Sequence, residues 1–238
     1  MEARSSGAGV SVWRTLWARN AAAAKANLLP GLILQAVGLL VVLLYYYFEP
    51  ARDFFMSVAQ LKEQHGYVYS GIATVVFGGL IPYVVHLLTG QVPNGMVRAY
   101  ALFSIFFWLW RGIEVDAFYR LQAELFGSEA SASVVIKKVL VDQFIYCVLW
   151  ASPVCAFFYS WRDYRFSWRS YRAANDRKSF LIEVMSFLVA TWIVWIPATA
   201  IIYSLPSPLQ IPLFNLALCF FVLLMSVLGN RNQHRKSP

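Results

Sequence analysis

Long apolar runs separated by short polar stretches dominate the pattern of residues along this chain. The clearest run is Phe180–Gly229, which is almost wholly apolar. A bilayer-spanning helix needs about 20 apolar residues, so this run is long enough for two. Pro206 and Pro208 divide it, because a proline removes a backbone donor and clashes with the preceding turn. We therefore predict a transmembrane hairpin whose two helices are Phe180–Leu205 and Leu209–Gly229.

Four further apolar segments repeat this pattern. We predict that they span the membrane at Leu28–Phe48, Tyr67–Gly90, Met96–Leu121 and Val134–Trp161. The third of these is the weakest prediction, since its strongly apolar part is too short to cross alone. Glu49–Gly66, between the first two, is predicted to be a polar linker that is partly helical. Pro82 is expected to kink the second span, and Pro197 is a further candidate helix break.

The composition agrees with membrane embedding. Hydrophobic residues make up 59% of the chain and charged residues only 13%, whereas a soluble domain has about 25% charged residues. The predicted fold is an all-α, polytopic transmembrane bundle of about six spans. It forms a single domain over residues 28–229, with a polar tail at 1–27 and a basic tail at 230–238.

The distribution of cations predicts the orientation of these spans. With six spans, both tails and the basic loop Arg162–Lys178 lie on one side, together with most of the 20 Lys and Arg residues. The positive-inside rule then places both termini in the cytoplasm or the mitochondrial matrix. The expected membrane is the inner membrane of a bacterial cell, or a mitochondrial or peroxisomal membrane in a eukaryote. Met1–Asn27 is interpreted as a topogenic tail, with a mitochondrial transit peptide as the alternative.

Polar residues inside the predicted spans are the candidate functional residues. Helical spacing predicts ion pairs of Arg111 with Glu114 and of Asp116 with Arg120, and it allows a pair of Asp142 with Lys138. Asp142 is expected to meet a cation, Lys138 or Arg111, or to face water. One interpretation is that these pairs only steady the helices, and the other is that they line an aqueous pathway that favours cations. The candidates for lining such a pathway are Asp142, Gln143, Lys138, Arg111, Glu114, Asp116 and His86.

Other classes of chemistry find no support in the sequence. The three histidines are far apart, and none has the spacing of a metal pair. The three cysteines lie inside apolar runs and are interpreted as packing residues. There is no nucleophile elbow, phosphate loop or nucleic-acid-binding module. We expect no enzymatic activity, no metal, no cofactor and no nucleic-acid partner.

Three stretches resemble the Mpv-seventeen family, also called the peroxisomal membrane protein twenty-two family. Lys137–Gln143 matches the pattern K-K-x-x-x-D-Q, and Gly112–Tyr119 is in register with G-P-x-x-H-x-W-Y. Pro197 and Pro208 keep the proline spacing of the family hairpin. The similarity covers residues 67–228, so the first span would be an addition. Several family residues are replaced here: Ile113 stands in place of a Pro, and Asp116, Ala200, Tyr203 and Pro212 stand in place of His, Gln, Asn and Arg.

The resemblance implies a function in membrane permeation, because this family is thought to form small channels or to protect organelle membranes. The expected activity is that of a pore or small-solute permeation protein. The alternative is a non-conducting protein that has a structural or partner-binding role. The expected partners are the lipid bilayer and small solutes or ions, and a homo-oligomer is compatible with both.

Overall fold

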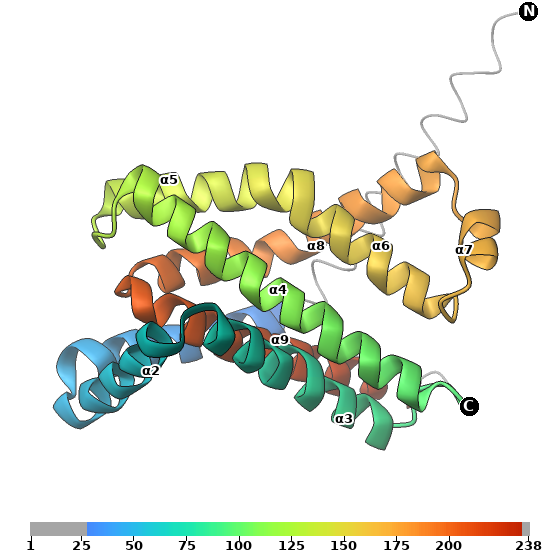
Figure 1. Cartoon of the computed structure of the whole chain (residues 1–238), viewed down its shortest axis with the longest axis horizontal. Helices are drawn as coiled ribbons and strands as arrows, with labels where there is room; N and C mark the ends of the chain where they lie inside the picture. Colours follow the sequence, from blue (N-terminus) through green and yellow to red (C-terminus); the bar gives the residue numbers. More distant parts are fainter. Residues whose placement is uncertain (1–27, 235–238) are drawn as a thin grey trace, which may run out of the picture.

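The computed structural model describes residues 28–234 and places them in an all-helical bundle (Figure 1). The predicted tail 1–27 and residues 235–238 lie outside the described part of the chain. The described part contains no strand. The all-α prediction is therefore confirmed for these residues.

The largest difference from the predicted boundaries is at the start of the second predicted span. The first helix covers Leu28–Tyr47, and α2 then covers Glu49–Thr74, so the predicted linker Glu49–Gly66 is helical nearly throughout. The helix changes direction at Gly66, whose φ of 52° and ψ of −124° are open only to glycine. A short π-helical segment, η1 (Val75–Leu80), and α3 (Ile81–Leu88) continue the same path.

The central helices form a second continuous path. After the turn that follows α3, α4 covers Val97–Phe126. It is followed by α5 (Ala132–Val141), the π-helical segment η2 (Asp142–Ala151) and α6 (Ser152–Asp163). Each π-helical segment stands just before a proline, Pro82 or Pro153. A π-helical turn is one way in which a membrane helix re-pairs the backbone groups that a proline frees.

The predicted hairpin has its turn near the expected place. After the short α7 (Trp168–Ala174), α8 covers Arg177–Tyr203 and α9 covers Ser207–His234. The break therefore falls at Ser204–Pro206, and Pro208 lies in the first turn of α9. Pro197, the other candidate break, lies inside α8 and does not end it.

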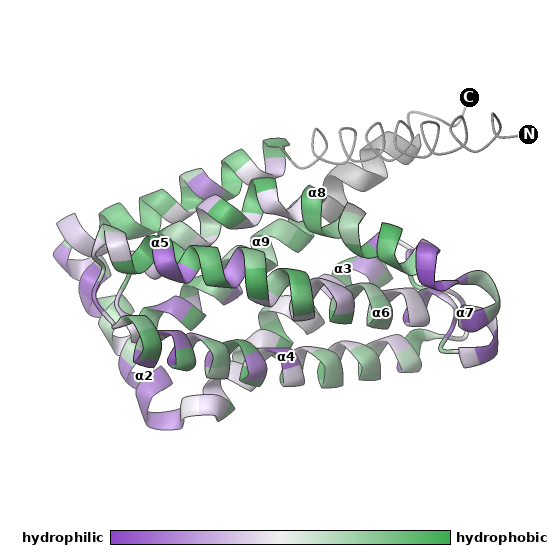
Figure 2. Cartoon of the chain, turned by 90° about the horizontal axis from the view of Figure 1, so that it is seen from above, coloured by the Kyte–Doolittle hydropathy of each residue, from purple (hydrophilic) through white to green (hydrophobic). Residues whose placement is uncertain are grey.

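Three described helices are long and apolar enough to cross a membrane, namely Leu28–Tyr47, Glu49–Leu88 and Ala132–Asp163. A fourth is added if the two parts of α8, which meet at an angle of 47°, count as one span. The long helix α4 is not among these helices, because Arg98, Arg111, Glu114 and Asp116 interrupt its apolar run. Hydrophilic residues gather mainly at the two ends of the bundle, as Figure 2 shows.

Close contacts between helices hold the bundle together. α4 packs along α2 and η1, and α9 packs against α2, η1, α3 and α8. At Gly112 of α4, an added Cβ atom would collide with the backbone oxygen of Ser70 and the side chain of Thr74. Gly71, Gly78 and Gly79 make comparably close contacts with α4 and α9, as expected for small residues at interfaces between membrane helices.

Candidate functional site

A cavity of about 570 Å³ lies among η1, α3, α4, η2, α6, α8 and α9. This volume is in the range of small-molecule sites in proteins. Both π-helical segments contribute to its wall, η1 through Gly78 and Gly79, and η2 through Asp142 and Cys147. Such segments occur frequently at functional sites. The cavity is therefore the candidate functional site.

Aromatic rings form much of the cavity wall. They come from α3, α4, η2, α6, α8 and α9, and several pack against one another, such as Phe103 against Tyr159 with 5.6 Å between the ring centres. The wall is therefore largely apolar, but it contains many aromatic rings, several of which carry hydroxyl groups. The aromatic lining residues are Tyr83, Tyr100, Phe103, Trp108, Tyr119, Tyr146, Tyr159, Phe187, Trp195, Phe214 and Phe221.

Asp142 is the buried carboxylate of the cavity, with only 4% of its surface exposed. It accepts hydrogen bonds from the Tyr203 hydroxyl at 2.5 Å, the Gln143 amide at 3.0 Å and the Cys147 thiol at 3.5 Å. The thiol is five residues further on, and the i→i+5 geometry of the π-helix brings it next to the carboxylate. All three donors are neutral.

The predicted ion pair of Asp142 with Lys138 is not formed. None of the ion pairs between described residues includes Asp142. Lys138 is 1% exposed and places its ammonium group 5.7 Å from the centre of the Tyr203 ring. The physical reason is that the Tyr203 hydroxyl occupies one carboxylate oxygen of Asp142, while the Tyr203 ring faces the lysine.

Arg111 is the buried cation of the cavity, and it forms the predicted pair with Glu114. The Tyr146 hydroxyl joins this pair by donating to Glu114 at 2.5 Å. The Nε atom of Arg111 is buried and has no hydrogen-bond partner. The charge of Arg111 is thus balanced by Glu114, which stands behind it and is not among the residues that line the cavity.

Tyr203 lies at the deep end of the hydrogen-bond network that includes Asp142. It is 1% exposed, it accepts a hydrogen bond from the Gln122 amide at 2.8 Å, and it donates to Asp142. Neither Tyr203 nor Gln122 lines the cavity. Because Tyr203 ends α8 beside the turn to α9, this network lies toward the end of the bundle opposite α7 (Figure 1).

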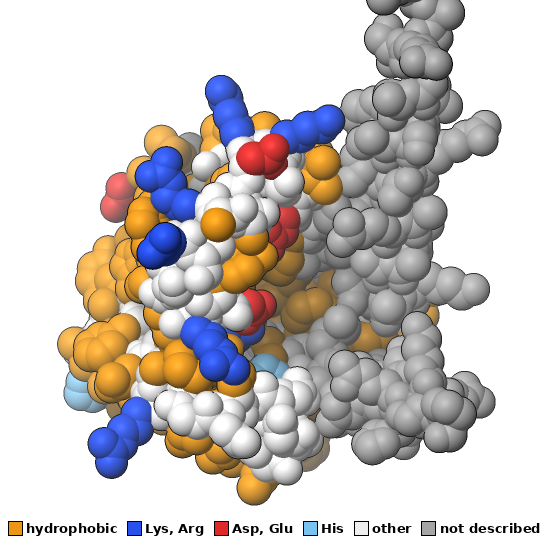
Figure 3. All heavy atoms as spheres, turned by 90° about the vertical axis from the view of Figure 1, so that its right-hand side faces the viewer, with side chains coloured by type: hydrophobic (Ala, Val, Ile, Leu, Met, Phe, Trp, Pro, Cys, Tyr) orange, Lys and Arg blue, Asp and Glu red, His pale blue; other side chains and the backbone are white. Residues whose placement is uncertain are grey.

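The other end of the cavity reaches the face that carries the loops around α7. Its lining there includes His86, Gln91, Arg162, Asp163 and Glu183. Figure 3 views this face and shows a recess at its centre, bordered by acidic and basic side chains. The cavity therefore extends from this end of the bundle inward to Arg111 and Asp142.

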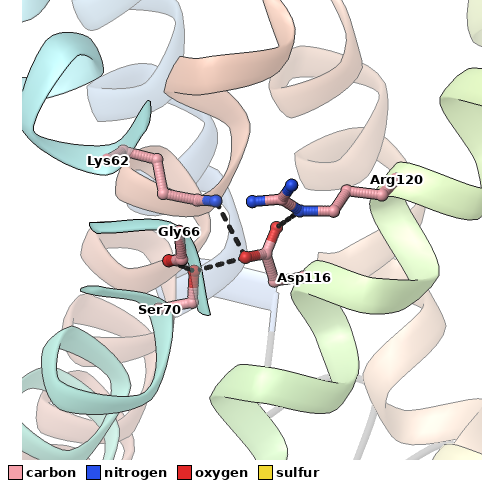
Figure 4. Close-up of polar contacts among 5 residues, drawn as sticks. All are labelled: Lys62, Gly66, Ser70, Asp116 and Arg120. Carbon is pink, nitrogen blue, oxygen red and sulfur yellow. Dashed lines mark hydrogen bonds and ion pairs between the residues drawn. The ribbon is translucent and has the colours of Figure 1, made fainter. Parts of the chain in front are cut away.

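Asp116 belongs to a separate cluster between α2 and α4 (Figure 4). Its carboxylate is 2.8 Å from the Lys62 ammonium group and 3.1 Å from Arg120 Nε, and it accepts a hydrogen bond from the Ser70 hydroxyl at 2.7 Å. The Asp116–Arg120 pair was predicted from spacing, but Lys62 was not. This cluster ties together the two sides of the bend at Gly66.

The structure thus divides the predicted site residues into two groups. Asp142, Gln143, Arg111 and His86 line the cavity, whereas Glu114, Lys138 and Asp116 do not. The sequence reasoning missed Tyr203 and Tyr146 as polar partners. Tyr203 carried a signal, because it stands where the resembled family has an Asn and is a polar residue near the end of an apolar run.

Comparison of the chain with models of known protein families, with curated proteins and with solved structures finds no match.

Proposed function

We propose that this protein is a membrane permeation protein for small solutes, in which the cavity forms part of the pathway. The observation that carries the proposal is the cavity itself, since it extends from the α7 end of the bundle to charged residues between the helices. Charged groups inside membrane proteins are rare and usually line solute pathways or form ion pairs. Asp142 has no ion-pair partner among the described residues, which favours the pathway interpretation.

The proposal includes a six-span arrangement with both tails on the cytoplasmic or matrix side. The helical segments support it, because the connection between α3 and α4 and the loop around α7 lie at one end of the bundle, while the turns before α5 and before α9 lie at the other (Figure 1). The basic loop Arg162–Lys178 is at the first of these ends. α4 is counted as a span because its charges are paired internally, at Arg111 with Glu114 and at Asp116 with Lys62 and Arg120.

In this arrangement the structure represents a closed state. The cavity is accessible from the α7 end, and the buried Tyr203–Gln122 pair separates it from the opposite end. Permeation then requires the Tyr203 side chain to move away from Asp142. Divergent membership of the Mpv-seventeen family is part of the same proposal, and it rests on the sequence motifs alone.

A non-conducting structural role is the second candidate, and one observation favours it. The interface of α2 and η1 with α4 is closely packed around glycines, and its one buried charge cluster is internally paired. None of the residues of that charge cluster lines the cavity. The cavity adjoins α2 and η1 only at Gly78 and Gly79 of η1 and extends from there toward α6 and α8, so the two candidates make different predictions for it.

Reconstitution of the purified protein in planar bilayers tests the proposal. We expect ion conductance above that of protein-free bilayers. The variant Thr191→Trp places a large ring in the cavity, because Thr191 is a lining residue, and we expect it to lower the conductance severalfold. The matched control is Ile193→Trp, on the same helix, because this side chain is 41% exposed on the outside of the bundle.

Equal conductance of the two variants would show that conduction does not depend on the cavity. Absence of conductance from folded wild-type protein would favour the non-conducting alternative. Circular dichroism and thermal unfolding in detergent establish in each case that the protein is folded.

A further inference from the structure

The charges around the cavity do not cancel. Two arginines, Arg111 and Arg162, and three carboxylates, Asp142, Asp163 and Glu183, line it. Arg111 is neutralised by Glu114 from behind, and Arg162 is paired with Asp163 at 2.8 Å. Two lining carboxylates therefore remain without a cation in any ion pair of the described residues, Asp142 at the deep end and Glu183 nearer the α7 end.

The deeper of these two carboxylates, Asp142, is suited to bind a positively charged ligand. Asp142 is held in place by three neutral donors, which fix its orientation without balancing its charge. An inorganic cation would lose its hydration shell here and gain few oxygen ligands in return, because the surrounding wall is largely aromatic. Such an ion is therefore a poor ligand for this site. A cation with an apolar body fits this wall better.

The aromatic wall supplies the second part of the recognition. The faces of Trp, Tyr and Phe rings attract cations, and sites that bind quaternary ammonium groups are built from such rings. Trp108, Tyr119, Tyr146, Tyr159 and Trp195 all line the cavity. The ammonium group of Lys138, 5.7 Å from the Tyr203 ring centre, already makes a contact of this kind just beyond Asp142.

We infer that the cavity is a binding site for small organic cations, with Asp142 as the counter-charge and the aromatic wall as the apolar contact. The inference deepens the proposed function and rests on it only in taking the bound cation to be a permeating solute. The cavity volume of about 570 Å³ accommodates a ligand of one aromatic ring and an ammonium group with space to spare.

Isothermal titration of the full chain in lipid nanodiscs tests the inference, with empty nanodiscs as the blank. The probes are benzyltrimethylammonium, its uncharged isostere 2,2-dimethyl-1-phenylpropane, and the anion phenylacetate. We expect the cation to bind more tightly than either of the others. Asp142→Asn should weaken binding of the cation by at least about tenfold and leave binding of the uncharged isostere unchanged. Asp53→Asn, which removes an exposed carboxylate elsewhere, is the matched control.

A second variant keeps the test decisive if Asp142→Asn does not fold. Trp195→Leu removes an aromatic face of the cavity, and Trp150→Leu removes a ring that is 48% exposed outside it. We expect Trp195→Leu to weaken binding of the cation severalfold, and Trp150→Leu to have no effect. Equal binding of the three probes, or a cation affinity that neither Asp142→Asn nor Trp195→Leu changes, would overturn the inference.

The inference and the proposed function fail in different ways. Selective binding of the cation by a protein that does not conduct would retain the binding site and reject permeation. Conductance without binding of the cation would retain permeation and reject the organic cation as ligand.

Discussion

Asp116 illustrates how single residues make this bundle compatible with a membrane. Its side chain is 3% exposed and meets Lys62, which is 6% exposed, and Arg120, which is 47% exposed. The guanidinium group of Arg120 also lies 4.6 Å from the centre of the Tyr67 ring. A charge that would be costly alone is thereby shared among neighbouring groups from α2 and α4.

Asp116→Asn is expected to destabilise the protein strongly. The change leaves the buried Lys62 ammonium group without its carboxylate, and breaking a buried ion pair in this way costs about 3–5 kcal/mol. Thermal unfolding in detergent measures the effect. Asp163→Asn, which removes one member of the more exposed Arg162–Asp163 pair, is the control and should cost no more than about 1 kcal/mol. A similar loss of stability in both variants would show that the buried carboxylate of Asp116 stabilises the protein no more than a partly exposed one does.

Individual pairings could be predicted where the partners share a helix, and not where they come from different helices. The Arg111–Glu114 and Asp116–Arg120 pairs follow from helical spacing alone, and the structure contains both. The Lys62–Asp116 and Tyr203–Asp142 contacts join residues far apart in the chain. The expected Lys138–Asp142 pair failed because a tyrosine from another helix reached the carboxylate.

At the scale of elements, the bend in α2 is the feature that the hydrophobic pattern did not reveal. The polar stretch that precedes the second predicted span is helical, and its direction changes at Gly66. Apolar runs predicted where the helices lie, and three or four of the six predicted spans correspond to described helices that are long and apolar enough to cross a membrane. The pattern could not separate a linker from a helix of mixed polarity, since both contain charged and apolar residues.

Gly66→Ala is expected to destabilise this bend. Residues other than glycine are strained at a φ of 52° with a ψ of −124°, and the cost is about 1–3 kcal/mol. The matched control is Gly38→Ala in the first helix, where the added Cβ atom meets only the side chain of Ile201, at 3.3 Å. Thermal unfolding should show a clear loss for Gly66→Ala and little change for Gly38→Ala. Equal effects would argue against a strained bend.

At the scale of the whole molecule, the alternation of helices and turns predicts which loops share a side of the membrane. Ser170 lies in α7 and Ser128 lies in the connection before α5, and both are exposed. If the chain crosses the membrane six times, these residues are on opposite sides. The cation distribution predicts that Ser170 is on the cytoplasmic or matrix side.

Labelling of introduced cysteines tests this arrangement. In sealed vesicles, a membrane-impermeant maleimide should label Ser170→Cys from one side only and Ser128→Cys from the other. Wild-type protein, with its three native cysteines, is the blank. Labelling of both variants from the same side would contradict the arrangement.

The π-helical segment η2 allows this part of the chain to lose one residue and remain helical. A π-helical turn contains one residue more than the α-helical turn it replaces. Loss of one residue within Asp142–Ala151 can therefore be absorbed by reversion to an α-helix, without shortening the path between the ends of the bundle. Because the reversion removes only the extra residue, the helical segments on either side of the deletion would keep their relative orientation. A deletion between Asp142 and Cys147 would therefore leave Asp142 facing the cavity but remove the i→i+5 contact between its carboxylate and the Cys147 thiol.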